Sequence, residues 1–178
     1  MERPAISTPT LVGASARRPL LIGQAPGPNT KQEFPLFPVP STSAGGRLQQ
    51  MTGLTRGGYL KTFERVNLLY EFPGRHKRDD KFPVAQARVA AQAMRPLLAG
   101  RVVVFVGRNV ANAFDFDEDF HVWRESLARR YCLVSKTPFR FVAAVIPHPS
   151  GRNHWYNNEE NRARSAEFWQ NFFEPDDK

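Results

Sequence analysis

The sequence predicts an α/β fold: a three-layer α/β/α sandwich around a central, four-stranded, mainly parallel sheet. The first observation is that four short apolar runs rich in Val, Ile, Leu and Phe are spread along the 178 residues. Secondly, these runs lack clean alternation of apolar and polar residues, which is typical of strands that are buried on both faces. Thirdly, segments of helical character lie between them, and strands that alternate with helices form parallel sheets covered on both sides.

The expected strands are the runs PLLIG, RVNLLY, RVVVFVG and RFVAAVIP, at 19–23, 65–70, 101–107 and 140–147. Expected helices cover 55–63, 82–98, 109–114 and a final segment that begins after Asn157 or Asn158. Asn is a favoured N-cap residue, and Glu159 and Glu160 would then occupy the first turn of this last helix. The stretch 26–46 is rich in Pro, Gly, Ser and Thr, and we expect it to be an ordered loop.

Side-chain spacing indicates which faces of two helices are buried. Pro83 lies near the expected start of the helix at 82–98, and its predicted buried face consists of Val84, Ala87, Ala91, Met94 and Leu98. Pro96 predicts an early end or a kink. The final helix would be anchored by four aromatic residues, namely Phe168, Trp169, Phe172 and Phe173.

Length and charge give the broad class of protein. The length fits a single domain over 1–178, with an N-terminal arm at 1–18 and a frayed tail at 174–178. Lys and Arg number 25 against 17 Asp and Glu, which leaves a formal charge of +8. Such an excess favours a polyanionic partner such as DNA, RNA or an anionic membrane. The alternative is that the charge only keeps the protein in solution.

Several classes of protein are excluded or disfavoured. A single cysteine, Cys132, rules out an intramolecular disulfide and a cysteine cluster for zinc or iron–sulfur. It lies in the apolar stretch YCLV, where we expect a buried side chain. The start of the chain lacks the features of a signal peptide, and no apolar run approaches the ~20 residues that span a bilayer. We therefore expect a cytoplasmic monomer that does not associate with membranes.

The ends of the expected strands contain the polar and glycine-rich material. In open α/β sheets, ligands bind beyond the carboxyl ends of the strands. GQAPG follows the first run, Asn67 lies within the second, GRN follows the third and PHPSGRNHWYN follows the fourth. Taken singly, each has an ordinary interpretation: a tight turn for GQAPG, local hydrogen bonds for Asn67 and a structural role for His148.

In combination, these motifs resemble the uracil-DNA glycosylase superfamily over about residues 20–169. GQAPG is similar to the superfamily's water-activating loop, which takes forms such as GQDPYH, GINPG or GEAPG. HPS at 148–150 is similar to its leaving-group motif. PLFPVPSTSAGGRL also resembles the PF…GxAGxLL stretch of the branches that hold an iron–sulfur cluster.

The resemblance implies a DNA glycosylase that flips a base out of the duplex and hydrolyses its N-glycosidic bond. Phe37 corresponds to the aromatic residue on which the base stacks, with Phe34 as its substitute if the loop register differs. Asn67 corresponds to the asparagine that reads the Watson–Crick edge of uracil, and His148 to the histidine that stabilises charge on the departing base. Substrate contacts are also implied for three residues of the first loop, namely Gly23, Pro26 and Gly27.

The water-activating loop departs from the superfamily's patterns. Several branches carry Asp or Asn at the position of Ala25, and the iron–sulfur branches have a Glu just before an Ala. Here that residue is Gln24, which can orient water but cannot act as a general base. We therefore expect a slower or more specialised monofunctional enzyme that needs no metal or cofactor. Gln24 and the loop backbone would position the water. Stabilisation of the leaving group by His148 would contribute most of the rate enhancement.

Two groups of residues are implied to contact DNA. Ser150 corresponds to a serine that binds phosphate, and Gly151, Arg152 and Asn153 to a loop that enters the minor groove, with Arg152 filling the space left by the base. A basic loop after the second strand would lie along the phosphates. Its members are Arg75, His76, Lys77, Arg78 and Lys81.

Gly27 stands where uracil-specific enzymes carry a tyrosine that excludes the 5-methyl group of thymine. A glycine leaves that side open, which predicts tolerance of 5-substituted uracils. Two other functions stay open: an inactive DNA-binding module or base sensor on the same fold, and an enzyme of free nucleosides. The second would need carboxylates, and the expected solvent-facing cluster consists of Asp115, Asp117, Glu118 and Asp119.

Overall fold

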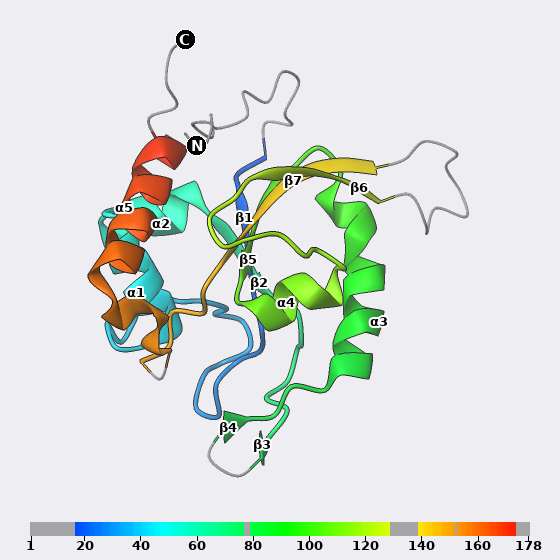
Figure 1. The fold of residues 1–178 in the computed structure, drawn as a ribbon. Helices are drawn as coiled ribbons and strands as arrows, with labels where there is room; N and C mark the ends of the chain where they lie inside the picture. The colour runs from blue at the N-terminus through cyan, green and yellow to red at the C-terminus, as the bar shows by residue number, and fades with distance from the viewer. Residues whose placement is uncertain (1–16, 77–78, 129–138, 152, 174–178) are drawn as a thin grey trace.

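The computed structural model describes residues 17–76, 79–128, 139–151 and 153–173 (Figure 1). Its strands are β1 (Leu20–Gly23), β2 (Glu64–Asn67), β3 (Arg75–His76), β4 (Asp79–Asp80), β5 (Val102–Val106), β6 (Arg124–Ala128) and β7 (Phe139–Ile146). The α-helices are α1 (Ala44–Met51), α2 (Arg56–Thr62), α3 (Val84–Met94), α4 (Arg108–Ala113) and α5 (Glu159–Phe173). Two short 3₁₀ helices are η1 (Arg95–Leu98) and η2 (His154–Asn157). None of the helices in these ranges is long and apolar enough to cross a membrane.

The central sheet has five strands in the order β2-β1-β5-β7-β6. The first four strands are mutually parallel, and β6 pairs antiparallel with β7 at the edge. The prediction of an α/β fold with a mainly parallel sheet is confirmed, and the number of four strands is wrong. The additional strand, RESLA, is polar because an edge strand needs no continuous apolar run.

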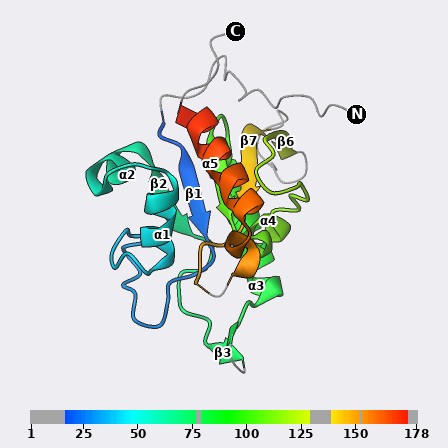
Figure 2. The same ribbon diagram turned by 60° about the vertical axis from the view of Figure 1, so that its left-hand side comes forward.

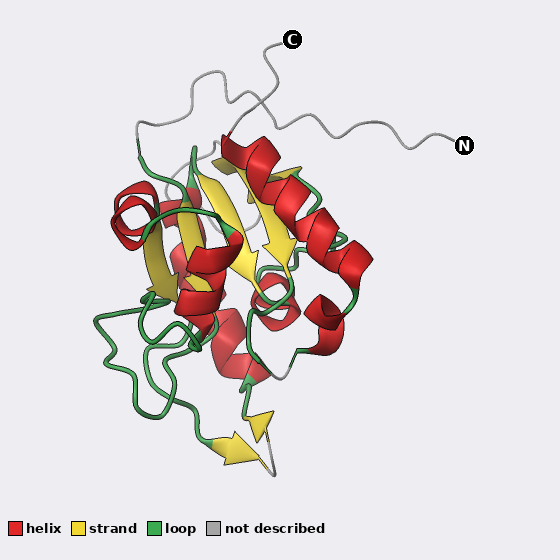
Figure 3. Ribbon diagram, turned by 90° about the vertical axis from the view of Figure 1, so that its left-hand side faces the viewer, coloured by secondary structure: helices red, strands yellow, loops and turns green. Residues whose placement is uncertain are grey.

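Apolar residues alternate between the two faces of the sheet, and both faces are covered. On one side, Leu20, Ile22 and Phe105 belong to a buried cluster completed by residues of α3 and α4. On the other side, Leu21 and Val104 belong to a second cluster with residues of α1, α2 and α5. Figure 3 shows helices on the two sides of the yellow strands. Burial on both faces explains why β1, β5 and β7 read as unbroken apolar runs, whereas β2 (ERVN) is only partly buried.

Four predicted helices are confirmed as α2, the α3–η1 segment, α4 and α5. Helix α1 was missed, because it begins inside the segment predicted to be a loop. Two glycines in its first turn, Gly45 and Gly46, disfavour a helix by propensity. The Ser43 hydroxyl caps this turn by accepting a hydrogen bond from the Gly46 N–H at 3.0 Å, which offsets part of that cost.

The predicted helix faces are confirmed with one exception. Val84 is 55% exposed, because it is the first residue of α3 and precedes the turns that pack against the sheet. Ala87 and Ala91 are fully buried on the predicted face. At the start of α5, the Asn158 side chain accepts a hydrogen bond from the Asn161 N–H at 3.2 Å, as its predicted cap role requires.

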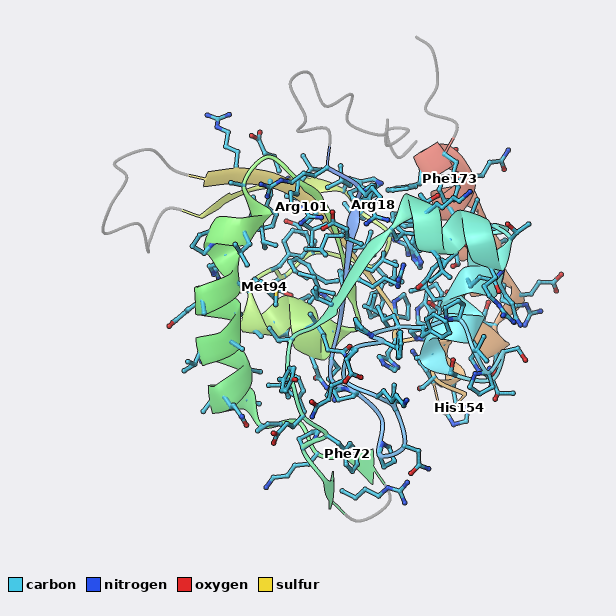
Figure 4. All side chains as sticks on the ribbon, turned by 180° about the vertical axis from the view of Figure 1, so that it is seen from behind. Arg18, Phe72, Met94, Arg101, His154 and Phe173 are labelled. Atoms are coloured by element: carbon cyan, nitrogen blue, oxygen red, sulfur yellow. The ribbon has the colours of Figure 1, made fainter. Side chains whose placement is uncertain are left out.

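Arg101 ties together the amino ends of three neighbouring strands. Its Nη2 donates to the Arg18 carbonyl at 2.9 Å and to Glu64 Oε2 at 2.6 Å, and its side chain is buried. Figure 4 shows Arg101 and Arg18 together at one end of the molecule, with Phe72 at the opposite end. This contact holds the amino ends of β2, β1 and β5 together.

The crossovers bring several loops to the carboxyl edge of the sheet. The chain leaves β1 and reaches β2 on one side through α1 and α2, and later reaches β5 on the other side of β1 through α3. Ligand sites of open α/β sheets lie at such a reversal of strand order. The arrowhead of β1 points toward this edge, and β3 projects beyond it (Figure 2).

His121 is buried in the aromatic layer beneath η2. Its ring lies 5.1 Å from the rings of Trp155 and Phe168, and its nitrogens have no hydrogen-bond partner within the described residues. Burial, with a smaller contribution from the positive charge of Arg164, lowers the pKa of His121 to about 4. The folded protein therefore holds this ring in its neutral form.

We predict that the free energy of unfolding decreases between pH 7 and pH 5. Between pH 6.5 and pH 4 the unfolded chain binds a proton at His121 that the folded protein does not, so acid favours unfolding. The expected loss at pH 5 is about 2 kcal/mol. Urea unfolding of wild type and His121→Phe at both pH values measures it. Equal losses in the two proteins would contradict this explanation.

Candidate functional site

A cleft of about 730 Å³ opens at the carboxyl edge of the sheet. Its walls come from segments that are far apart in the sequence: residues 24–31, much of 34–47, Asn67, parts of 72–75, Asn109 and parts of 148–151. The predicted residues that line it are Gln24, Ala25, Pro26, Gly27, Phe37, Asn67, Arg75, His148, Ser150 and Gly151. The structure thus brings most of the sequence-predicted site residues into one cavity.

Gly23 is not among the lining residues, although the resemblance placed it against substrate. A Cβ atom on Gly23 would lie 2.6 Å from Asn67 Oδ1 and 3.2 Å from the Leu36 side chain. The space above this glycine is therefore filled by the protein itself. Its role is indirect: it allows the Asn67 amide and the loop that contains Leu36 to approach the sheet closely.

Asn67 ends β2 directly opposite Gly23. Its side chain is partly buried and lines the cleft. Within the part of the chain that the structure describes, its amide makes no hydrogen bond to protein, so a donor and an acceptor are both left for a ligand.

The loop after β1 holds Gln24 at the cleft. The Leu69 N–H donates to the Gln24 carbonyl at 2.9 Å, which extends the pairing of the first two strands beyond β2. The Asn109 amide donates to Gln24 Oε1 at 3.5 Å. Ala25 packs against the core cluster that includes Phe105, so its small side chain contributes surface and no polar group.

Phe37 is fixed by contacts to the backbone of its own loop. Leu36 has a φ of +48°, an unusual conformation for a bulky residue. Its carbonyl accepts a hydrogen bond from the Tyr59 hydroxyl at 3.2 Å, and the Phe37 carbonyl accepts one from the Ser43 hydroxyl at 3.3 Å. A Cβ atom on Gly45 would collide with this backbone. Strained backbone held by its surroundings is typical of functional loops.

Tyr59 keeps its proton for this contact. Burial raises the pKa of its hydroxyl well above the ordinary value, and the positive charge of Arg65 offsets only part of that rise. The hydroxyl therefore stays a donor to the Leu36 carbonyl over the whole physiological pH range.

His148 follows β7 and is held from two sides. Gly107, with a φ of +106°, lies so close that its Cβ would be 3.2 Å from the His148 Cβ and 3.5 Å from Cδ2. On the other side, the Asn153 amide donates to the His148 carbonyl at 2.8 Å, and the Tyr156 hydroxyl donates to the Pro147 carbonyl at 2.8 Å. The ring is partly buried and lines the cleft.

Asn153 has a structural role that the sequence did not suggest. Besides its donation to His148, its Oδ1 accepts a hydrogen bond from the Trp155 N–H at 3.1 Å and caps η2. Both ends of its amide are therefore engaged within the protein, which makes it a poor candidate for a DNA contact. Arg152, predicted to enter the minor groove, lies outside the described residues.

The predicted basic loop contains two short strands, β3 and β4, which pair antiparallel, with His76 opposite Asp79 and Arg75 opposite Asp80. Arg75 lines the cleft, whereas Lys81 is exposed after β4 and does not. Lys77 and Arg78 lie outside the described residues. Of the loop's described cations, the structure therefore places Arg75 at the cleft.

The sequence analysis missed several lining residues, among them Lys31, Arg47, Phe72 and Asn109. Arg47 lies in SAGGRL and Asn109 in GRN, and both stretches had been noted as parts of larger patterns. Their positions depend on how α1 and α4 pack at the sheet edge, which the local sequence does not reveal. Among the described residues that line the cleft there is no Asp or Glu.

The acidic cluster at 115–119 lies outside the cleft. Asp115 pairs with Arg95 at 2.8 Å, and Glu118 pairs with Arg124 at 2.8 Å. Asp117 is fully exposed, as expected. Within the described ranges, no group of three or more His, Cys, Asp or Glu side chains is arranged to bind a metal ion.

Comparison with known proteins gives no match: neither a model of a known protein family nor a curated protein sequence matches this chain.

We predict that Gly23→Ala destabilises the protein by about 1–3 kcal/mol, because the added methyl group displaces either the Asn67 amide or Leu36. Gly57→Ala is the matched control, since no atom lies within 4 Å of a Cβ on this residue of α2. The control should be neutral or slightly stabilising. Urea unfolding of both variants tests the difference, and equal midpoints would contradict the close packing at Gly23.

Proposed function

We propose that the protein is a DNA glycosylase that hydrolyses the N-glycosidic bond of uracil or a related, 5-modified pyrimidine, on a fold like that of uracil-DNA glycosylases. One observation supports this proposal most strongly: Phe37, Asn67 and His148 are far apart in the sequence and line one cleft. The sequence resemblance gives these three residues complementary roles toward a single planar base.

Base recognition would use Phe37 and Asn67. The Phe37 ring offers a stacking surface, and stacking of a base on an aromatic ring contributes about 1–3 kcal/mol. The Asn67 amide can donate to uracil O4 and accept from N3–H at the same time. The absence of a protein partner for this amide among the described residues supports a role in ligand recognition.

Bond cleavage would depend on His148 and a water molecule. As the bond between the sugar C1′ and the base nitrogen breaks, its electron pair moves onto the base, and negative charge grows at O2. A donor fixed in advance stabilises that charge without reorganisation, and the contacts of His148 to Gly107 and Asn153 hold it in place. Water then adds to C1′ and releases a proton to solvent.

Gln24 would orient this water without accepting its proton. Its Oε1 accepts from Asn109, and the pair adds two amides to a cleft whose described lining has no carboxylate. A reaction with a strongly developed sugar cation needs little activation of the attacking water, so stabilisation of the leaving base becomes the larger contribution. The expected enzyme is slower than one with an Asp in this loop.

We predict that the protein releases uracil from an oligonucleotide and leaves an alkali-labile abasic site. Asn67→Ala and His148→Ala should each lower the rate by roughly a hundredfold or more, since each removes a polar group that contacts the reacting base. His154→Ala is the matched control, because this histidine is exposed on η2 and does not line the cleft. Strand cleavage by hot alkali after timed incubation measures all three.

Two results would contradict an enzymatic role. Wild-type protein that binds the oligonucleotide but releases no base would support a base sensor or DNA-bound regulator instead. Release that is unchanged in both Asn67→Ala and His148→Ala would assign the activity to another site.

We predict release of 5-hydroxymethyluracil at a rate comparable to that of uracil. A Cβ atom on Gly27 would contact only Thr30 Oγ1, at 3.1 Å, so the structure leaves room on this side of the cleft. Gly27→Leu should lower release of the 5-substituted base at least tenfold more than release of uracil. Parallel time courses on the two oligonucleotides test this, and strict uracil-only activity of the wild type would refute it.

A further inference from the structure

The cleft contains more aromatic surface than one flipped base requires. Phe34, Phe37 and Phe72 all line it. Phe34 is 48% exposed, and its ring centroid lies 5.3 Å from that of Phe37, with 54° between the ring planes. A large apolar side chain left half-exposed at the mouth of a cleft is a candidate for contact with a ligand.

The charge of the cleft fits a nucleic-acid strand. Lys31, Arg47 and Arg75 line it, and the described lining includes no carboxylate. Arg47 Nε donates to the Thr42 carbonyl at 3.2 Å, and its Nη2 would lie 2.8 Å from a Cβ on Gly151. This guanidinium therefore reaches from α1 to the loop after His148, where a phosphate could contact both walls.

We propose that the cleft takes its substrate from a single strand, in which the base next to the target stacks on Phe34 while the target base occupies the slot at Phe37. A basic groove with aromatic platforms is typical of single-strand binding sites. The identity of the target base rests on the proposed function, whereas binding of the strand and the role of Phe34 do not.

The angle between the two rings is the reason to prefer a single strand. Bases stacked on Phe34 and Phe37 would be inclined by about the 54° between the rings, so two neighbouring nucleotides must be splayed apart. In a duplex, the neighbours of a flipped base stay paired and stacked, and freeing a second one costs a few kcal/mol more. An unpaired strand can adopt the splayed conformation at lower cost.

The test compares single-stranded and duplex DNA of the same sequence. Fluorescence anisotropy with the full chain uses a labelled 12-mer that carries one 2′-fluoro-2′-deoxyuridine, which resists hydrolysis, and a labelled oligothymidylate without uracil. Wild-type protein should bind each single strand at least tenfold more tightly than its duplex. Phe34→Ala should weaken single-strand binding about tenfold, at the low end for loss of one stacked base, and leave duplex binding unchanged.

Two further variants identify the role of the ring. Phe34→Trp should retain tight binding, because it keeps a stacking surface. Tyr70→Ala is the matched control: Tyr70 is a 73% exposed aromatic residue that does not line the cleft, and its removal should have no effect. Equal weakening of single-strand and duplex binding by Phe34→Ala, no weakening at all, or tighter duplex binding by the wild type would each overturn the inference.

The outcome is separable from that of the proposed function. Tight single-strand binding that depends on Phe34, without release of any base, would uphold the strand-binding site and reject the glycosylase. Release of uracil from duplex as fast as from single strands, with no effect of Phe34→Ala on either rate, would uphold the glycosylase and reject this inference.

Discussion

The close approach of β1 and β2 at their carboxyl ends is the constraint on which the site depends. Gly23 and Asn67 are opposite each other in the parallel register, and the Asn67 amide oxygen occupies the space that a side chain on Gly23 would take. Leu36 packs into the same space, so one glycine positions both the amide and the loop that bears Phe37. Because the register of a parallel pair is fixed along its whole length, the partly buried Arg101–Glu64 contact at the amino ends helps to hold Asn67 in place at the other end.

The extent to which the fold could be predicted follows from where each element is buried. Strands β1, β5 and β7 are covered on both faces, so continuous apolar runs reveal them. Strand β6 is partnered on one edge only, and its sequence RESLA lacks that signal. Helix α1 was not predicted, because its two glycines are required by tertiary packing. A Cβ on Gly45 would collide with the backbone of Leu36 and Phe37, and a Cβ on Gly46 would collide with the backbone of Pro40 and Ser41. Propensity cannot anticipate a glycine that is required by a neighbouring loop.

The site was partly predictable for a related reason. Gln24, Asn67 and His148 end or follow strands, and parallel strands deliver their carboxyl ends to one edge, so their convergence follows from topology. Arg47 and Asn109 lie on helices, and their place at the cleft depends on how those helices pack. Asn153 is the opposite case, in which a residue predicted to contact the ligand has a structural role. Its position beside HPS suggested a ligand contact, yet both ends of its amide hold the protein's own backbone, at His148 and Trp155.

A cleft with Lys31, Arg47 and Arg75 and no described carboxylate poses an electrostatic problem for the proposed chemistry. A developing sugar cation is destabilised by nearby positive charge, and Gln24 offers only a dipole in compensation. In the proposed reaction, DNA itself would supply the missing charge, because its phosphates would neutralise the basic residues that they contact and place negative oxygens beside the sugar. On this proposal the cationic wall serves catalysis only when a polynucleotide is bound. A free nucleoside would bring no phosphates to this wall, so on the same proposal the charges that would attract the strand would disfavour hydrolysis of nucleosides.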